Sequence, residues 1–154
     1  YGGYVVQLAK SEGLRVIADA SHNDEDLVSE LGADIVVPRG DDIAQQMIKV
    51  VLEGVDGLVD GSVQNHLSVG AVRDGGSFVS VRYWEGTAER DIEFHQTSVS
   101  DYFHRADLLS ELSRQVEDEI LTLRVAETFP AEAAAKAHEK LEAGGTRGRC
   151  VIVF

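Results

Sequence analysis

Short apolar runs alternate with longer stretches of helical periodicity along most of the chain. The short runs, rich in valine and isoleucine, predict strands, and the longer stretches space their apolar residues along one helix face. The predicted strands are 15–20, 34–37, 55–60, 77–82, 92–99, 121–126 and 149–154. The predicted helices are 4–11, 24–31, 41–53, 65–72, 102–119 and 131–143.

Residues at the segment ends support several of these boundaries. Asp101 is expected to cap the helix 102–119. Pro130 is expected in the first turn of the last helix, where its missing N–H costs nothing. Residues 74–76, an aspartate followed by two glycines, are expected to end the helix 65–72.

The order of the segments indicates an α/β fold. Strands that alternate with helices of this length form βαβ units and a parallel sheet. Right-handed crossovers then give a doubly wound sheet with helices on both faces. The regular alternation of short strands and helices ends after residue 83. We therefore expect a Rossmann-like nucleotide-binding portion over 1–83 and a C-terminal segment over 84–154.

The first strand of such a sheet has no counterpart in the sequence. An open parallel sheet normally begins with a strand that leads through a glycine turn into the first helix. This chain starts on the turn itself, with Gly2 and Gly3. We therefore expect a sheet lacking its first strand, with a gap at its middle. Either another polypeptide supplies the strand or the chain is part of a longer one.

Composition argues against several partners. Lys and Arg number 14 against 27 Asp and Glu, a net charge of −13. Such a surface repels a phosphate backbone, so we expect no binding to nucleic acids or anionic membranes. We also expect no signal peptide and no membrane span, which needs ~20 apolar residues. The single cysteine, Cys150, cannot form an internal disulfide, and a reducing cytoplasm is the expected setting.

Six short motifs follow one another along the chain, and in this order they are specific. They are residues 2–10, 16–21, 31–34, 72–81, 124–130 with Ala134 and His138, and 141–145 followed by Gly148 and Arg149. The sequence resembles the second half of the zinc-independent, quinone-oxidoreductase-like medium-chain dehydrogenase/reductases. The first half of that family, a GroES-like catalytic domain, and the first nucleotide-binding strand have no counterpart here.

The resemblance implies an NAD(P)H-dependent oxidoreductase that transfers hydride to quinones, enones or other activated carbonyl compounds without a metal. The cofactor carries such chemistry, and the protein supplies binding, orientation and electrostatics. The segment 84–154 would complete the sheet and form the C-terminal part of the family's catalytic domain. The expected partners are a small-molecule substrate and the missing N-terminal half or a second copy of the chain.

The resemblance places the cofactor pyrophosphate at the start of the first helix. Gly2 matches the last glycine of the family's phosphate-binding turn. The N–H groups of Gly3 and Tyr4 offer donors at the positive end of the helix. Tyr1 departs from the small aliphatic residue expected at its position.

The end of the second strand of the family's sheet is expected to select between NADP and NAD. An acid there binds the ribose hydroxyls of NAD, whereas a hydroxyl or cation accepts the 2′-phosphate of NADP. In the favoured register Ala20 takes the acid's place, and Ser21 and His22 face the 2′-phosphate, which favours NADP. A slip of one residue would make Asp19 an NAD-type acid. The acidic residues 24–26 would repel a 2′-phosphate, so NAD remains an alternative cofactor.

The carboxyl ends of two later strands are expected to border the nicotinamide half of the cofactor. These positions are Asp60, Gly61 and Ser62 after one strand and Ser80, Val81 and Arg82 at the end of the next. Arg149, at the start of the final strand, is a further cofactor contact that the resemblance implies. No catalytic residue is assigned, and no Cys/His cluster has the spacing of a metal site.

Two other functions are weighed against this one. A non-catalytic nucleotide-binding or interaction module could fold with a partner chain or as a dimer, because an unpaired strand edge invites pairing. Another doubly wound nucleotide-binding enzyme, such as a methyltransferase, is disfavoured by the motifs at 124–130 and 144–154.

Overall fold

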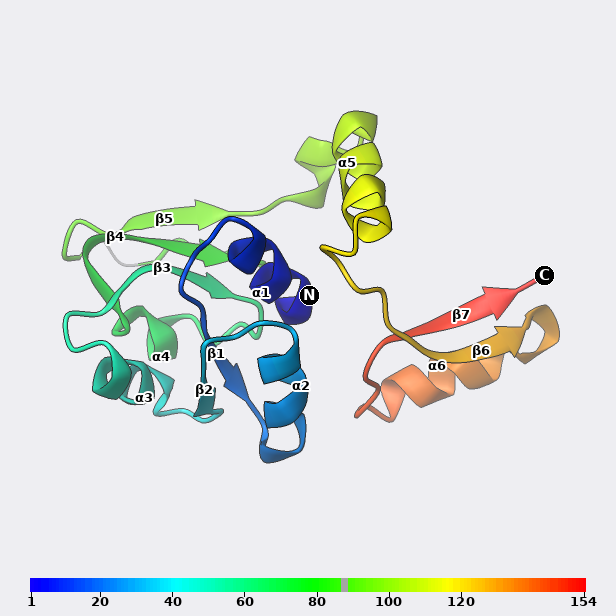
Figure 1. Ribbon diagram of the computed structural model, residues 1–154, viewed down its shortest axis with the longest axis horizontal. Helices are drawn as coiled ribbons and strands as arrows, with labels where there is room; N and C mark the ends of the chain where they lie inside the picture. The colour runs from blue at the N-terminus through cyan, green and yellow to red at the C-terminus, as the bar shows by residue number, and fades with distance from the viewer. Residues whose placement is uncertain (87–88) are drawn as a thin grey trace. The chain divides into compact units, whose positions relative to one another are not determined.

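The apolar runs of the sequence form parallel strands that alternate with helices (Figure 1). The computed structural model describes residues 1–86 and 89–154. These residues divide into an N-terminal unit, Tyr1–Glu111, and a C-terminal unit, Leu112–Phe154. All strand pairs in both units are parallel in the described part of the chain, which confirms the predicted fold class.

The N-terminal unit holds most of the helices and strands. Its elements are α1 (Gly2–Ser11), β1 (Ile17–Ala20), η1 (His22–Asp24), α2 (Glu25–Glu30), β2 (Ile35–Pro38), α3 (Ile43–Val50), β3 (Val55–Asp60), α4 (His66–Val69), β4 (Val72–Ser80), β5 (Glu93–Gln96) and η2 (Val99–Tyr102). Helix α5 (Ala106–Glu117) runs across the boundary between the two units.

The sheet of the N-terminal unit is divided at its middle, as expected from the sequence. Its described strands form a pair, β1 with β2, and a triple in the order β3-β4-β5. Residues of β1, β2 and β3 pack against one apolar cluster centred on Ile43 and Met47 of α3. The two pieces therefore share a core, although no ladder of backbone hydrogen bonds joins β1 to β3 among the described residues.

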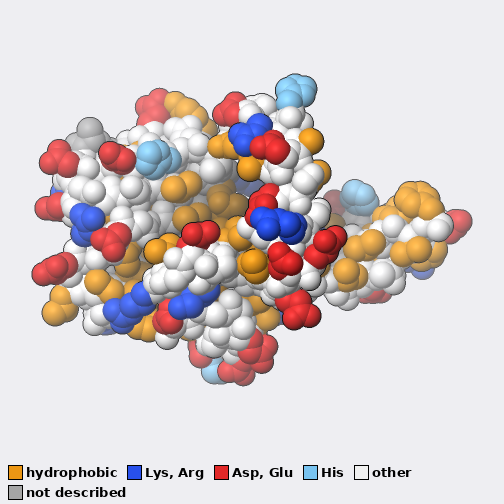
Figure 2. Space-filling view, turned by 45° about the horizontal axis from the view of Figure 1, so that its top comes forward, with side chains coloured by type: hydrophobic (Ala, Val, Ile, Leu, Met, Phe, Trp, Pro, Cys, Tyr) orange, Lys and Arg blue, Asp and Glu red, His pale blue; other side chains and the backbone are white. Residues whose placement is uncertain are grey.

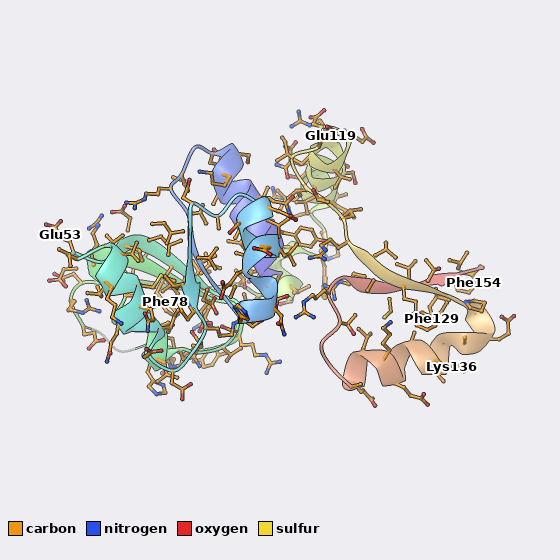
Figure 3. All side chains as sticks on the ribbon, turned by 60° about the horizontal axis from the view of Figure 1, so that its bottom comes forward. Glu53, Phe78, Glu119, Phe129, Lys136 and Phe154 are labelled. Atoms are coloured by element: carbon orange, nitrogen blue, oxygen red, sulfur yellow. The ribbon has the colours of Figure 1, made fainter. Side chains whose placement is uncertain are left out.

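Two sets of contacts hold the helices to these strands. Helices α3 and α4 lie together and away from α1 and α2 (Figure 1). A second cluster surrounds Phe78 of β4, which is fully buried and touches Trp84 and Phe94 at ring-centroid distances of 5.3 and 5.6 Å. Figure 3 shows Phe78 inside the N-terminal unit. The apolar residues of α4, β3, β4 and β5 thus form one side of the core.

The predicted helix 65–72 is wrong at its C-terminal end. Helix α4 stops at Val69, and Val72 already pairs with β3. The guanidinium of Arg90 donates to the carbonyls of Val69 and Val72 at 3.0 and 2.8 Å, and these bonds hold the turn between helix and strand. Residues 74–76 belong to β4, where Gly75 has a φ of +66°, and do not end a helix.

Predictions around α5 and β6 (Val125–Pro130) also need correction. Asp101 lies in η2, and α5 starts only at Ala106. The strand predicted at 121–126 starts four residues too early, since β6 begins only at Val125. The N–H groups of residues 120 and 121 are instead bound by the Gln115 carbonyl at the end of α5. Pro130 ends β6 in an extended conformation and is not in the first turn of a helix.

The C-terminal unit is a single βαβ arrangement. Strand β6 pairs with β7 (Arg149–Val153), and η3 (Ala131–Ala133) and α6 (Ala134–Glu142) connect them. Phe129 lies between β6 and α6 (Figure 3) and is buried, as is Ala137 of the helix. Many other apolar side chains of this unit are exposed, and Figure 2 shows hydrophobic side chains on its surface.

None of the helices in the described residues is both long and apolar enough to span a lipid bilayer.

Candidate cofactor site

Helix α1 begins without a side-chain cap. The N–H groups of Tyr4 and Val5 donate to the Tyr1 carbonyl at 3.0 and 3.3 Å, and Tyr1 makes no side-chain bond to the helix start. The first N–H groups of a helix have no partner within it. Those of Gly2 and Gly3 are therefore donors at the positive end of α1, the position that the sequence assigned to a pyrophosphate. The Tyr4 N–H, which was expected to be a donor together with that of Gly3, is already bonded to the Tyr1 carbonyl within the helix.

The two glycines of this turn have different surroundings. A Cβ added to Gly2 would meet nothing within 4 Å, so the space beside it is open. A Cβ on Gly3 would lie 2.9 Å from Leu31 Cδ1, at the end of α2. Gly3 thus allows α1 to approach α2 closely, whereas nothing in the described packing requires a glycine at position 2.

The ring of Tyr1 connects the start of α1 to the end of β3. A Cβ on Gly61 would lie 2.9 Å from Cδ1 of this ring. Partial burial raises the pKa of the Tyr1 phenol above its usual value of 10.0. Two segments that were predicted to touch the cofactor, residues 2–4 and 60–62, therefore lie side by side.

The carboxylate of Asp60 organises the loop that follows β3. Asp60 is only 3% exposed, and its oxygens accept the backbone N–H groups of Ser62 and Asn65 at 3.0 and 2.6 Å. Val63 and Asn65 both have positive φ, at 63° and 49°. The Asp60 side chain thus holds a constrained loop in place.

One acceptor in this loop is unsatisfied. Asn65 Oδ1 is buried and has no hydrogen-bond donor in the part of the chain that the structure describes. Buried polar atoms nearly always have a partner, so an orphan marks a place where a bound molecule can supply one. This atom and the open space at Gly2 are the two observations that fit a bound cofactor.

The end of β4 is fixed by short-range bonds. The Ser80 hydroxyl is buried, donates to the Arg82 carbonyl at 2.7 Å and accepts the Arg82 N–H at 3.4 Å. The Val81 N–H donates to the Asp60 carbonyl at 3.3 Å, which joins this segment to the end of β3. The Arg82 side chain is exposed and makes no bond to a described residue.

Two residues after β1 were predicted to face a 2′-phosphate. The Ser21 hydroxyl donates to Asp24 Oδ2 at 2.6 Å. The His22 side chain is 94% exposed, and its Nδ1 lies 3.4 Å from Glu25 Oε1. Ser21 and His22 both lie at the carboxyl end of β1. Each side chain, however, contacts an acidic residue of the following helical segments η1 and α2.

An ion pair at the same edge was missed by the sequence analysis. Arg39, directly after β2, donates through Nε to Asp19 Oδ2 at 2.6 Å. Asp19 was considered only as an acid that could bind a ribose. The signal for Arg39 was its place after the second of two paired strands, as the only Lys or Arg between residues 16 and 48.

Arg149 and Cys150 belong to the C-terminal unit. Arg149 is the exposed first residue of β7, and its N–H donates to the Arg124 carbonyl at 2.8 Å. Cys150 is a free, partly buried thiol in the same strand. No group of three His, Cys, Asp or Glu residues within 1–86 and 89–154 has the arrangement of a metal site.

Comparison with known proteins gives one family and several related folds. Residues 31–152 match the sequence model of a family described as zinc-binding dehydrogenase. A zinc-type alcohol dehydrogenase-like protein of Staphylococcus epidermidis is 26% identical over 172 residues, which cover 98% of this chain. The chain spans about half the length of this curated relative, 51% of it.

Two solved structures share the fold. The crystal structure of an NAD-dependent alcohol dehydrogenase is 27% identical, with a TM-score of 0.81 over 97% of this chain and 46% of its own. A mycobacterial quinone oxidoreductase is 22% identical, with a TM-score of 0.83 over 99% of this chain and 53% of its own. In each case the similarity extends over nearly all of this chain and about half of the other.

Proposed function

The chain belongs to the zinc-binding dehydrogenase family, and on that premise we propose that it is the cofactor-binding half of an NAD(P)H-dependent oxidoreductase. We propose quinones, enones or other activated carbonyl compounds as its substrates. The observation that carries the proposal is the uncapped start of α1 beside the loop of Asp60. These two segments offer backbone donors, open space at Gly2 and an unpaired acceptor at Asn65.

The residues of this chain would bind and orient the cofactor. The N–H groups at the start of α1 would hold the pyrophosphate, with the helix dipole favouring its negative charge. The loops after β3 and β4 would border the nicotinamide, because ligands of such sheets lie beyond the carboxyl ends of the strands. The bond from Val81 N–H to the Asp60 carbonyl would keep these two loops at a fixed spacing.

A bound nicotinamide dinucleotide would supply the hydride, and reduction of the substrate also needs one proton. No residue of this chain is assigned as the proton donor. The described residues do not provide a zinc ligand set, although the family description names zinc. We therefore assign no step to zinc and propose that the cofactor half acts without a metal.

Binding of NADPH and NADH to the full-length protein tests the proposal by calorimetry. We expect at least one of the two to bind. A Gly2→Val substitution should weaken that binding by about tenfold or more, the equivalent of ~1.4 kcal/mol. The reason is that the new side chain would occupy the open space beside the α1 N–H groups without touching described protein atoms near Cβ.

Gly57→Ala is the matched control for this substitution. Its added Cβ would lie 3.9 Å from the Ser77 carbonyl oxygen, an ordinary contact within the sheet, and should leave cofactor affinity unchanged. A folded full-length protein that binds neither dinucleotide would refute the proposed function. That result would favour the alternative of an interaction module, for which the inner edges of β1 and β3, which pair with no strand among the described residues, are the supporting observation.

A further inference from the structure

The segment that follows β4 carries two side chains with acid–base chemistry in direct contact. Tyr83 and Glu85 lie shortly after Ser80, the last residue of this strand. The Tyr83 hydroxyl donates a hydrogen bond to Glu85 Oε1. Tyr83 is 75% exposed, and Glu85 is exposed as well. The phenol and the carboxylate are therefore accessible both to solvent and to a molecule bound beyond the end of the strand.

The residue between them, Trp84, fixes the backbone of this segment. Its half-buried ring packs against Phe78 and Phe94 at centroid distances of 5.3 and 5.5 Å. The Trp84 carbonyl accepts the side-chain amide of Gln96 at 3.2 Å. A Cβ added to Gly86 would lie 2.6 Å from the Phe94 ring, so the chain stays close to this ring after Glu85 too. Contacts with the aromatic core thus hold the backbone that carries both exposed side chains.

Tyr83 and Glu85 directly follow the loop to which the proposed function assigns the nicotinamide. The Val81 N–H donates to the Asp60 carbonyl at 3.3 Å, which keeps the ends of β3 and β4 together. Ligands of doubly wound sheets lie beyond these carboxyl ends. The two side chains therefore belong to the edge of the sheet where hydride transfer would take place.

The contact with Glu85 keeps the Tyr83 phenol protonated at neutral pH. The hydrogen bond to the Glu85 carboxylate, followed by its negative charge, raises the pKa of Tyr83 above the usual value of 10.0. The neighbouring cation, Arg82, makes no bond to either side chain. A general acid must carry its proton at the working pH, and tyrosine is among the side chains that serve in this way.

We propose that Tyr83 is the catalytic residue that donates the proton in the reduction, and that Glu85 is a positioning residue for its phenol. The proposal rests on the proposed function, because it names the acid which that reaction needs. Hydride addition to an enone leaves an enolate. The Tyr83 hydroxyl then turns from Glu85 to the substrate, its O–H bond breaks, and the proton forms a C–H bond at the α-carbon. The electron pair of the O–H bond stays on the phenolate, which regains a proton from a solvent hydronium ion through the Glu85 carboxylate.

The first test compares the reduction of cyclohexenone and benzoquinone by the full-length protein with NADPH or NADH. Tyr83→Phe should lower kcat for cyclohexenone by about 100-fold or more, the usual contribution of a general acid. Its kcat for benzoquinone should fall much less, because the hydroquinone anion spreads its charge over an aromatic ring and needs an acid less. Dinucleotide affinity should change by less than about twofold. Tyr102→Phe is the matched control, since the Tyr102 hydroxyl is exposed and makes no bond to a described residue, and it should change neither rate.

The second test follows ionisation of the Tyr83 phenol in the protein without cofactor or substrate. The difference in near-ultraviolet absorbance between the wild type and Tyr83→Phe isolates this phenol from the other tyrosines. We expect its titration above pH 10.0. Glu85→Gln should move the titration to lower pH, because the amide removes the charge that holds the proton on the phenol. Glu89→Gln, a change of an exposed acid shortly after Glu85, should leave it in place.

The outcomes separate this proposal from the proposed function. Full activity of Tyr83→Phe toward cyclohexenone, or equal losses with cyclohexenone and benzoquinone, would overturn the assignment of the proton donor. An unchanged phenol titration in Glu85→Gln would overturn the role of Glu85. A wild-type protein that binds neither dinucleotide, or that binds one and reduces neither probe, would instead refute the proposed function itself.

Discussion

At the scale of single residues, Asp60 shows how a buried charge stabilises irregular backbone. Two residues of the loop after β3, Val63 and Asn65, have positive φ, and residues other than glycine held in such sparsely populated regions cost about 1–3 kcal/mol each. Asp60 accepts two N–H groups of this loop and offsets part of that cost. The aspartate that the sequence suggested as a cofactor contact thus has a structural role in the described contacts.

Asp60→Asn should destabilise the protein by about 2 kcal/mol. The amide would present an NH₂ group to one of the two N–H donors, which would leave that buried donor without an acceptor. Urea unfolding followed by circular dichroism measures the change. Asp56→Asn is the control, because the Asp56 side chain is 91% exposed, and it should have almost no effect. Equal losses in the two variants would contradict this role of Asp60.

At the scale of elements, Asp34 ties α1, β1 and β2 together at the amino ends of the strands. Its carboxylate accepts the Val16 N–H at 2.7 Å and the Lys10 ammonium at 2.9 Å. The Lys10 ammonium also donates to the Leu14 carbonyl at 3.2 Å. The Val16 N–H, followed by Lys10, holds the pKa of Asp34 below its usual value of 3.8.

The contribution of Asp34 to stability should therefore depend on pH. A carboxyl whose pKa is lowered by folding stabilises the protein above its unfolded pKa and loses this effect as pH falls through the folded pKa. Asp34→Asn should thus be less stable than the wild type near neutral pH. The difference should shrink once the pH falls below about 3.8, as denaturant titrations across this range can measure.

Glu53→Gln serves as the control for this titration. Glu53 extends from the surface after α3 (Figure 3) and makes no bond to a described residue. Its substitution should give a small difference from the wild type at every pH. A stability difference for Asp34→Asn that stays constant below pH 3.8 would show that its carboxylate is not responsible.

At the scale of the whole molecule, negative charge dominates the surface. The chain carries a net charge of −13, and Figure 2 shows acidic side chains over much of the visible face. A large net charge of one sign keeps a protein soluble but destabilises the compact state through self-repulsion. Several of the basic residues pair with acids, as in the ion pairs of Lys10, Arg39, Arg73 and Arg105.

Salt should therefore stabilise the chain at neutral pH. Raising NaCl from about 20 mM to about 200 mM shortens the screening length from roughly 20 Å to below 10 Å and weakens long-range repulsion. We expect a higher Tm at the higher salt concentration. The gain should be much smaller near the sequence pI of about 4.6. A Tm that falls with salt at neutral pH would show that attractive ion pairs outweigh the net repulsion.

The strands and helices were predictable where their signals are local. Strand β3 was predicted with its observed bounds, Val55–Asp60, from a short apolar run bounded by glycine. The resemblance to the second half of a dehydrogenase family is confirmed by the matching family and structures. The prediction failed at Val72 and Pro130, where distant partners decide the conformation. Arg90 binds the carbonyl of Val72, and Val153 pairs with Pro130.

The sequence by itself determined the alternation of helices and parallel strands and the glycine turn at the start of α1. These features follow from hydrophobic periodicity and backbone preference, which act over a few neighbouring residues. Only the tertiary structure decided which side chains remain available at the carboxyl edge. The pairing of Asp19 with Arg39, twenty residues apart, depends on the register of two strands. Side-chain partners of this kind leave no periodic pattern in the sequence.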